Sequence, residues 1–572
     1  MELQPVFDLV ELLSRRGVMH AILCPGSRSA PLTIAFSRHD RIQTWVIPDE
    51  RSAGFVALGM AQQTGKPTVV VCTSGSAAYN LAPAVAEAFY SHVPLLVLTA
   101  DRPAEWIDQL DGQTIRQPQL YGNHVKRSIG IPQELAHADA LWHANRLVNE
   151  AVQECLASPA GPVHLNFPFR EPLYPGSTDP VFRREGVRTI DDNAGEVVTS
   201  PTMAEKLKAR WAGYSKIMVV AGQQSPDSTM LKVLDRLVKK QQVVVVGDII
   251  SNLHSVSGVV RHADGYLAHL GAIAKKSLQP ELLVTVGRSV ISKNLKLFLR
   301  QHPALEHWHV QPEGVAPDTF QQLTEVIHAR PEQVLQALSD AETPKDFDVQ
   351  KRTNYVRLWQ AEENRFARTA AAFFDAHPTG EFALVRKLLQ ALPSRCNLHL
   401  ANSMTVRYAN FVGLSADQVG VHVFSNRGTS GIDGCTSTAV GQSLVTTVPN
   451  VLVTGDMAFF YDRNAFWHPY PLPNLHVVVI NNHGGVIFNL IDGPGNLPEK
   501  DKYFITQQSL SAASLASEFN FAYSQVKEDL KGWEAITRFE GKTKILEVEG
   551  QQASARSIFE AFKLAIRKSY ES

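Results

Sequence analysis

Short runs of aliphatic residues recur along the chain, each followed by a polar turn and then by residues at helical spacing. Early runs occupy residues 19–24, 68–72 and 95–99, and the turns PGSRS, TSGSA and ADRP follow them. Later runs occupy residues 217–220, 243–246, 282–286, 451–453 and 477–480. Continuous apolar strands that alternate with helices are typical of parallel sheets covered on both faces. The pattern predicts an α/β fold of doubly wound parallel sheets, with ligands at the carboxyl ends of the strands.

Two stretches of different composition interrupt this alternation. Residues 172–201 are rich in Pro, Gly, Asp and Thr, and residues 341–352 are charged and contain a proline. We interpret both as linkers, because domain boundaries fall in exposed polar segments that few contacts cross. The sequence therefore predicts three α/β domains, which cover residues 1–180, 200–340 and 355–572.

The first and third predicted domains have a similar pattern. In each, a helix with an Ala-x-Gly step leads to a strand, a helix and a second strand; the steps are Ala57 to Gly59 and Ala439 to Gly441. Two explanations stay open. The domains are duplicates that pair around a shared site, or the similarity is coincidental, since doubly wound domains share this alternation.

The overall charge is close to neutral, with 55 Lys and Arg against 56 Asp and Glu. This balance argues against a general nucleic-acid binder, which needs a basic surface. No apolar run approaches the roughly 18 residues that a membrane span requires, and the N-terminal residues lack the pattern of a secretory leader. The five cysteines are scattered without a Cys-x-x-Cys pair. We therefore expect a cytoplasmic protein with reduced thiols.

Candidate metal ligands follow two strands of the third predicted domain. The apolar run 451–453 is followed by Thr, Gly and then Asp456. Asn482 comes 26 positions after Asp456 and is followed by His-Gly-Gly. A carboxylate, an amide oxygen and the carbonyl of Gly484 suit Mg²⁺ or Mn²⁺, which takes its other ligands from phosphate and water. An alternative is an Asp helix cap and an Asn turn, which are common at strand ends. The pattern resembles the Gly-Asp-Gly and Asn-Asn signature of thiamine diphosphate enzymes, with Met457 as the third residue.

Glu50 in the first predicted domain is the second candidate. It ends the segment TWVIPDE and begins an Ala- and Gly-rich helical stretch. A Glu at a helix start is often only a favourable partner of the helix dipole. The thiamine diphosphate enzymes place a catalytic Glu at such a position, against N1′ of the aminopyrimidine ring. In that family the two cofactor-binding domains come from different subunits, which implies a homo-oligomer with active sites at the subunit interface. Dimer and tetramer both stay open.

The chain most resembles one branch of these enzymes over residues 22–490. The matching stretches include CPGSRSAPL, DERSAGFVALG, TSGSAAYNLAPAVAEA, NSMTVR, SNRGTSGIDG and NNHGGVIFNL. They resemble the MenD family of menaquinone synthesis, the 2-succinyl-5-enolpyruvyl-6-hydroxy-3-cyclohexene-1-carboxylate (SEPHCHC) synthases. The resemblance implies a pyrimidine-binding first domain, a Rossmann-like central domain and a third domain that binds diphosphate and metal. It also implies a transferase that decarboxylates 2-oxoglutarate and adds the succinyl carbanion to isochorismate.

The resemblance also implies roles for individual residues. Both substrates are dianions, and arginine suits them because its planar fork stays charged and binds carboxylate at two points. Arg407 and Arg427 match the residues that hold the succinyl carboxylate. The residues that match the isochorismate site are Ser27, Arg28, Arg102, Gln113 and Lys293, with Ser403 beside them. A surface ion pair of little energetic value is the alternative for any single arginine.

Three apolar residues complete the expected site. Ile432 matches the residue that holds the cofactor in its bent shape, and Ile487 and Phe488 match the wall around the reacting carbon. Core packing is the alternative for each. The sequence departs from the family at Gly112, where Asn is common, and at Asn294, where Arg is common.

Two other functions are compatible with the fold. One is another thiamine carboligase or decarboxylase, such as an acetolactate synthase-like enzyme, although the central domain lacks a glycine cluster for a nucleotide cofactor. The other is a non-catalytic binding protein. Such a protein is expected to lack Glu50 or Asp456, and the presence of both residues argues against it.

Overall fold

The computed structural model describes residues 4–174, 187–191, 199–342, 344, 347–490 and 497–571. Much of the first predicted linker, and three residues of the second, lie outside these ranges. The limits of the three predicted domains therefore stay a prediction. No helix of the described ranges is long and apolar enough to cross a membrane.

Three sheets organise the chain, and every strand pair in them is parallel. The six-stranded first sheet has the order β2-β1-β3-β4-β6-β5. Its elements are α1 (Gln4–Arg15), β1 (His20–Leu23), α2 (Ala30–Ser37), β2 (Gln43–Val46), α3 (Glu50–Thr64), β3 (Thr68–Cys72), α4 (Ser76–Asn80), α5 (Ala82–Tyr90), β4 (Leu95–Asp101), η1 (Ala104–Trp106), η2 (Gly122–His124), β5 (Arg127–Gly130), α6 (Ala138–Leu156) and β6 (Val163–Pro168). The central strands β3 and β4 are buried along their whole length, as their apolar runs predict.

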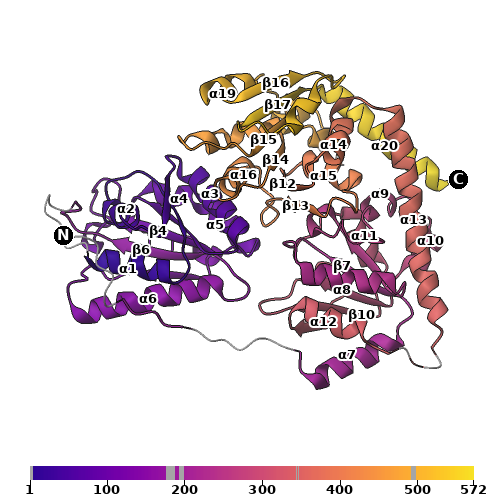
Figure 1. Cartoon of the computed structure of the whole chain (residues 1–572), viewed down its shortest axis with the longest axis horizontal. Helices are drawn as coiled ribbons and strands as arrows, with labels where there is room; N and C mark the ends of the chain where they lie inside the picture. The colour runs from indigo at the N-terminus through magenta and orange to yellow at the C-terminus, as the bar shows by residue number, and fades with distance from the viewer. Residues whose placement is uncertain are drawn as a thin grey trace.

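The central sheet has five strands in the order β11-β10-β9-β7-β8. The surrounding elements are α7 (Pro201–Gly213), β7 (Ile217–Ala221), α8 (Ser228–Lys239), β8 (Val244–Gly247), η3 (Ile249–Ser251), α9 (Ala263–Tyr266), α10 (Ala272–Leu278), β9 (Leu282–Val286), α11 (Lys293–Gln301), β10 (Glu306–Gln311), β11 (Glu325–His328) and α12 (Pro331–Ser339). The long helix α13 (Val349–Ala376) then runs along one side of the molecule to the third sheet (Figure 1).

The third sheet again has six strands, in the order β13-β12-β14-β15-β17-β16. Its elements are α14 (Gly380–Gln390), β12 (Arg395–Leu400), α15 (Met404–Val412), β13 (Gly420–Phe424), α16 (Cys435–Leu444), β14 (Asn450–Gly455), α17 (Asp456–Tyr461), η4 (Arg463–Phe466), β15 (Leu475–Asn481), α18 (Ile487–Leu490), the π-helix η6 (Lys500–Ile505), α19 (Ala512–Glu518), β16 (Ala522–Val526), η7 (Trp533–Thr537), β17 (Lys544–Glu549) and α20 (Gln552–Glu571). Counted from the first strand of each, the first and third sheets have the same strand order.

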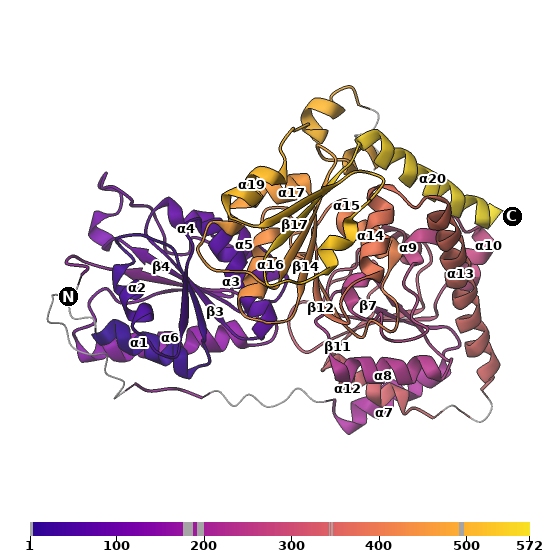
Figure 2. The same cartoon turned by 45° about the horizontal axis from the view of Figure 1, so that its top comes forward.

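Helices α3 and α16, which carry the two Ala-x-Gly steps, pack directly against each other (Figure 2). A Cβ atom on Gly59 would lie 2.1 Å from the carbonyl oxygen of Thr438, and one on Gly441 would lie 2.0 Å from that of Val56. Only glycine permits so close an approach of two helix backbones. The shared strand order and this reciprocal contact favour duplicated domains over coincidence.

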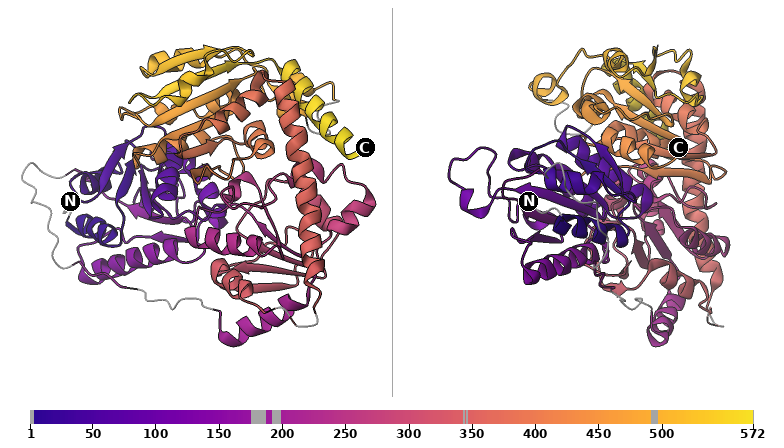
Figure 3. Two further views of the ribbon diagram at one scale, coloured as in Figure 1. Left: turned by 45° about the vertical axis from the view of Figure 1, so that its right-hand side comes forward. Right: turned by 60° about the vertical axis from the view of Figure 1, so that its left-hand side comes forward.

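The central and third sheets meet at the edge strand β13. Asn252, which follows η3 with φ +58°, is almost fully buried there. Its side-chain oxygen accepts a hydrogen bond from the N–H of Val423 at 2.7 Å, and its Nδ2 donates to the carbonyl of the same residue at 3.1 Å. The side chain thus pairs with the strand edge as a neighbouring strand would. The third sheet is thus in contact with the first through α3 and α16 and with the central sheet through Asn252, and Figure 3 gives two further views of this arrangement.

Candidate active site

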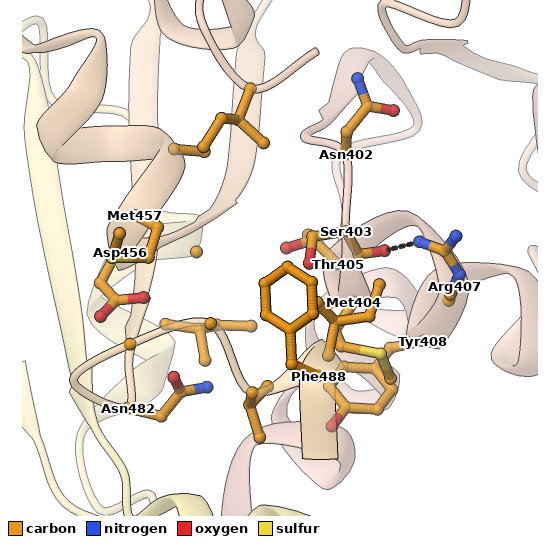
Figure 4. Close-up of a pocket in the computed structure, with 18 of the residues that line it drawn as sticks. Asn402, Ser403, Met404, Thr405, Arg407, Tyr408, Asp456, Met457, Asn482 and Phe488 are labelled. Atoms are coloured by element: carbon orange, nitrogen blue, oxygen red, sulfur yellow. Dashed lines mark hydrogen bonds between the residues drawn. The ribbon is translucent and has the colours of Figure 1, made fainter. Parts of the chain in front are cut away.

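A cavity of about 390 Å³ opens at the carboxyl ends of β12, β14 and β15, where the alternation of strands and turns predicts ligands. Its wall comes from the third domain. Three segments supply most of it, namely 402–405 with 407–408, 455–458, and 482 with 484–488; the other lining residues are Glu381, Arg427, Ser430, Ile432, Ile480, Phe504 and Ile505. Figure 4 shows Asp456 and Asn482 on one side, Arg407 on the opposite side, and the ring of Phe488 between them.

Asp456 and Asn482 lie next to the cavity and are 2% and 5% exposed. The Asp456 carboxylate accepts a hydrogen bond from Nε2 of Gln508 at 2.7 Å. Burial raises the pKa of Asp456, while hydrogen bonds from Gln508 and from the backbone of Met457 and Gly484 oppose the shift. A buried carboxylate with a raised pKa is one that a cation would stabilise in its charged form.

The amide of Asn482 gives a second indication of a cation. Its Nδ2 donates to Oε2 of Glu381 at 3.0 Å, which fixes the orientation of the amide. The buried Oδ1 then has no hydrogen-bond partner among the described residues. Such an acceptor is costly unless it receives a ligand. Among the described residues no three His, Cys, Asp or Glu side chains form a metal site. The predicted ligands, Asp456, Asn482 and Gly484, are not of this kind, because they are one carboxylate, one side-chain amide oxygen and one backbone carbonyl. Oxygen ligands of these types fit a hard divalent cation.

Gly484, the third predicted metal ligand, has a backbone that favours glycine. Its φ is +151°, in the region that favours glycine, and a Cβ atom would lie 2.8 Å from the carbonyl oxygen of Ile505. The backbone conformation and the close packing against Ile505 both explain why glycine occupies this turn.

Arg407 and Arg427, the two candidate arginines of the third domain, line the cavity. Nη1 of Arg407 donates to the carbonyl of Ser403 at 2.5 Å, and Nη1 of Arg427 donates to Oδ1 of Asn402 at 2.8 Å. Burial lowers the pKa of both arginines, and the charge of Arg407 adds to the shift at Arg427. Neither pairs with an acidic side chain among the described residues. Acidic side chains act on them only at longer range: Asp264 on Arg407, and Glu87 and Asp248 on Arg427. Two neighbouring guanidinium groups with no ion-pair partner among the described residues suit an incoming carboxylate.

The three apolar candidates belong to the wall of the cavity. Ile432, Ile487 and Phe488 all line the cavity, and the Phe488 ring packs at a tilt against Phe504 with centroids 5.8 Å apart. Ser403, also on the wall, has φ +75° and ψ −132°, a conformation that costs a non-glycine residue backbone energy. Strain of this kind is concentrated at functional sites.

Glu50 does not line the cavity of its own chain. It is the first residue of α3 and is half-buried, with Oε2 3.4 Å from Nδ2 of Asn80. The preceding residue, Asp49, accepts the N–H groups of Arg51 and Ser52 and so caps the helix. Because Asp49 supplies the cap, the Glu50 carboxylate is not needed for it.

The other first-domain candidates form a separate cluster. Arg28, 4% exposed, donates to the carbonyl of Phe169 at 3.0 Å and to Glu171 at 3.2 Å. Arg102 lies 3.9 Å from the same carboxylate. Ser27 and Gln113 are exposed on neighbouring turns, and Lys293 is exposed at the start of α11 in the central domain. Within one chain, this cluster and Lys293 do not line the cavity with the third-domain residues.

Two parts of the chain match known family descriptions. Residues 6–122 match "Thiamine pyrophosphate enzyme, N-terminal TPP binding domain", and residues 196–400 match "Middle domain of thiamine pyrophosphate". A SEPHCHC synthase of Cytophaga hutchinsonii is 43% identical over 580 residues, which cover 99% of this chain and all of that protein. This chain belongs to the SEPHCHC synthase family.

More distant members of the SEPHCHC synthase family agree. The Bacteroides thetaiotaomicron synthase is 36% identical over 93% of this chain and 92% of its own length. The Porphyromonas gingivalis synthase is 37% identical over 90% of this chain and 88% of its own length. The matches confirm the predicted family, its three-domain α/β fold and a thiamine diphosphate-dependent enzyme.

At the two positions where the sequence departs from the SEPHCHC synthases, both residues make local contacts. The carbonyl of Gly112 accepts a hydrogen bond from Nη2 of Arg102 at 2.9 Å. The side chain of Asn294 donates to the carbonyl of Asp264 at 2.7 Å, and its backbone N–H donates to the Asp264 carboxylate. Asn294 is therefore engaged within the central domain.

Sequence reasoning missed two polar residues that contact the candidate metal ligands. Glu381, in the first turn of α14, accepts hydrogen bonds from Asn482 and, at 2.7 Å, from the hydroxyl of Tyr408. Burial raises the pKa of Glu381. Gln508 bridges Asp456 and the side chain of Asn481. In the sequence Glu381 is indistinguishable from a dipole-stabilised helix start, and Gln508 belongs to no pattern.

Proposed function

We propose that this chain is a SEPHCHC synthase that decarboxylates 2-oxoglutarate and joins the resulting succinyl unit to isochorismate by conjugate addition, as a step of menaquinone synthesis. The observation that carries the proposal is the pairing of two features across one cavity. A buried carboxylate and an amide oxygen without a hydrogen-bond partner lie on one side, and two arginines that form no ion pair among the described residues lie on the other. A diphosphate–metal cofactor and a carboxylate substrate require these two features together.

The first side suits the cofactor. Asp456, Asn482 and the carbonyl of Gly484 would hold Mg²⁺ or Mn²⁺ against the diphosphate, and Ile432 would support the bent cofactor. When bound, thiamine diphosphate supplies the nucleophilic carbon and the electron sink that decarboxylation of a 2-oxo acid needs. Glu381 would have a positioning role, because the hydrogen bond that it accepts from Nδ2 of Asn482 leaves Oδ1 free to bind the metal.

The second side suits the donor substrate. Arg407 and Arg427 would bind the distal carboxylate of 2-oxoglutarate, and their fixed charge keeps this contact independent of pH. Ile487 and Phe488 would exclude water from the reacting carboxylate. Loss of carbon dioxide disperses the negative charge of that carboxylate, so an apolar wall favours the step.

The acceptor and the catalytic Glu50 would come from a partner subunit in a homo-oligomer. Glu50, Ser27, Arg28, Arg102 and Gln113 all belong to the first domain, and none of them lines the cavity of its own chain. A second copy would bring them to it. There Glu50 would hold a proton at N1′ of the aminopyrimidine, while Lys293 and Ser403 would complete the isochorismate site. Tyr79, next to the Asn80 that contacts Glu50, is 55% exposed, as expected of a surface that a partner covers.

We also propose a cytoplasmic location. All five cysteines are free and buried, and none forms a disulfide in the structure. This state is typical of proteins in a reducing compartment.

The reaction is tested directly by mass spectrometry. The protein is incubated with thiamine diphosphate, Mg²⁺, 2-oxoglutarate and isochorismate, and the adduct of succinyl unit and ring is expected. Omission of isochorismate should abolish it. Turnover of pyruvate in preference to 2-oxoglutarate would overturn the proposal in favour of an acetolactate synthase-like enzyme.

A further inference from the structure

The loop that carries Arg427 is held by side chains from all three domains. We call residues 425–431, between β13 and α16, the arginine loop. From the third domain, Nδ2 of Asn402 donates to the carbonyls of Asn426 and Gly431 at 2.7 and 2.6 Å. From the central domain, Nε2 of Gln223 donates to the carbonyl of Ser425 at 2.8 Å.

The contact from the first domain is the most extensive. Glu87 on α5 is 0% exposed and accepts hydrogen bonds from the two residues that follow Arg427. Oε1 accepts the N–H of Gly428 at 2.9 Å, and Oε2 accepts both the N–H and the hydroxyl of Thr429, at 2.7 and 2.8 Å. A fourth donor is the hydroxyl of Ser91, one helical turn along α5, at 2.6 Å from Oε1.

The local sequence is adapted to this contact. A Cβ atom on Gly428 would lie 2.8 Å from the carbonyl oxygen of Glu87 and 3.0 Å from its Oε1, so the loop needs glycine to approach α5. Burying a carboxylate is costly unless donors and positive charges surround it. Four donors do so here, and the charge of Glu87 also acts on Arg427 and on Arg288 of the central domain.

We propose that Glu87 is a positioning residue for the substrate carboxylate, acting through Arg427. Its three bonds to the loop fix the backbone just after Arg427, while Asn402 fixes the guanidinium itself. The first domain thereby sets where this charge lies in the cavity of its own chain. The inference rests on the proposed role of Arg427 in binding 2-oxoglutarate. A structural tie between domains with no influence on substrate is the alternative that the experiment must exclude.

Two variants that each remove one donor to the same carboxylate give a matched comparison. Thr429→Val removes the loop hydroxyl, and Ser91→Ala removes the hydroxyl of the residue that directly follows α5. Hydrogen bonds to charged groups are strong enough that Thr429→Val should raise the KM for 2-oxoglutarate about tenfold. Its kcat and the KM for isochorismate should change less than about twofold, and Ser91→Ala should leave both KM values within about twofold. An unchanged KM for 2-oxoglutarate in Thr429→Val would overturn the inference.

A double-mutant cycle tests whether the effect passes through Arg427. Glu87→Gln replaces one acceptor oxygen by an NH₂ group, which then faces the N–H and O–H donors of Gly428 and Thr429. It should therefore raise the KM for 2-oxoglutarate more than Thr429→Val does. In the Arg427→Ala background, Glu87→Gln should cause no further rise, because the group that it positions is gone. Equal effects in both backgrounds, or loss of the thermal shift with thiamine diphosphate and Mg²⁺, would identify a structural tie instead. If wild-type protein does not turn over 2-oxoglutarate, the proposed function fails; normal wild-type turnover with unaffected variants refutes only the role of Glu87.

Discussion

Glu50 and Asp456 should act together only across subunits, and mixed oligomers test this quantitatively. In a single chain Glu50 begins α3 and is absent from the wall of the cavity that Asp456 lines. Glu50→Gln should lower turnover by about 10²–10⁴-fold, the usual contribution of a positioned proton-transfer group. Asp456→Asn should also be inactive, because it removes the charged metal ligand. Neither homo-oligomer then retains an intact site.

A mixed dimer of these two chains contains one site with both native residues and one site with neither. It should therefore have about half the activity of the wild-type dimer, and a random mixture of the chains about a quarter, since about half of its dimers are mixed. The two chains are co-expressed with different affinity tags, the mixed species is isolated on both tags, and adduct formation is measured by mass spectrometry.

The reciprocal arrangement is the control. A chain with both substitutions, paired with a wild-type chain, has one defect in each shared site and should be inactive. If Glu50 served its own chain, the two results would be exchanged: this pair would have half activity and the first pair none. That outcome would refute the subunit-shared site.

Three further predictions concern single side chains. Glu171, whose carboxylate is 71% exposed and pairs with Arg28, occupies the proposed isochorismate site. Because exposed ion pairs are worth about 0.2–1 kcal/mol, Glu171→Gln should lower the KM for isochorismate by up to about fivefold and leave that for 2-oxoglutarate unchanged. Thiamine diphosphate and Mg²⁺ at a hundredfold excess over Kd should stabilise the native protein by about 2.7 kcal/mol in thermal unfolding, and Asn482→Ala should lose most of this gain. For Glu11, burial alone would raise the pKa, but hydrogen bonds from two arginines and a histidine outweigh it and lower the pKa to about 2. The ionised Glu11 carboxylate therefore stabilises the folded protein fully above pH 4.5, and this stabilisation is lost as the pH falls from 4.5 towards about 2. In urea unfolding, Glu11→Gln should lower the free energy of unfolding strongly at pH 6 and less at pH 3.

Each of these predictions has an opposite outcome that contradicts it. A rise in the isochorismate KM of Glu171→Gln would mean that the carboxylate orients the arginines rather than competing with substrate. A full thermal shift in Asn482→Ala would show that the amide oxygen of Asn482 does not bind the metal. If Glu11→Gln lowers the free energy of unfolding equally at both pH values, the ionisation of Glu11 does not contribute to stability.

The sequence predicts those parts of the site whose chemistry lies within a few residues of a strand end. Asp456 and Asn482 each follow an apolar run, and parallel strands bring such ends to one edge of the sheet. Glu381 and Gln508 could not be found this way, since they reach the site from other elements. Glu87 is harder still. In an Ala-rich helix it reads as an ordinary polar position, and only the packing of the first domain on the arginine loop makes it a buried acceptor.

The contact of Asn252 with Val423 has a consequence for the behaviour of the protein in a crowded cell. An outermost strand with free N–H and C=O groups is a template on which strands of other molecules can align and aggregate. Here the N–H and C=O groups of Val423, on the outer side of β13, are paired with the Asn252 amide of the domain that precedes β13 in the chain. During synthesis that domain emerges from the ribosome first. The central domain, which carries Asn252, can thus already be folded when β13 is synthesised.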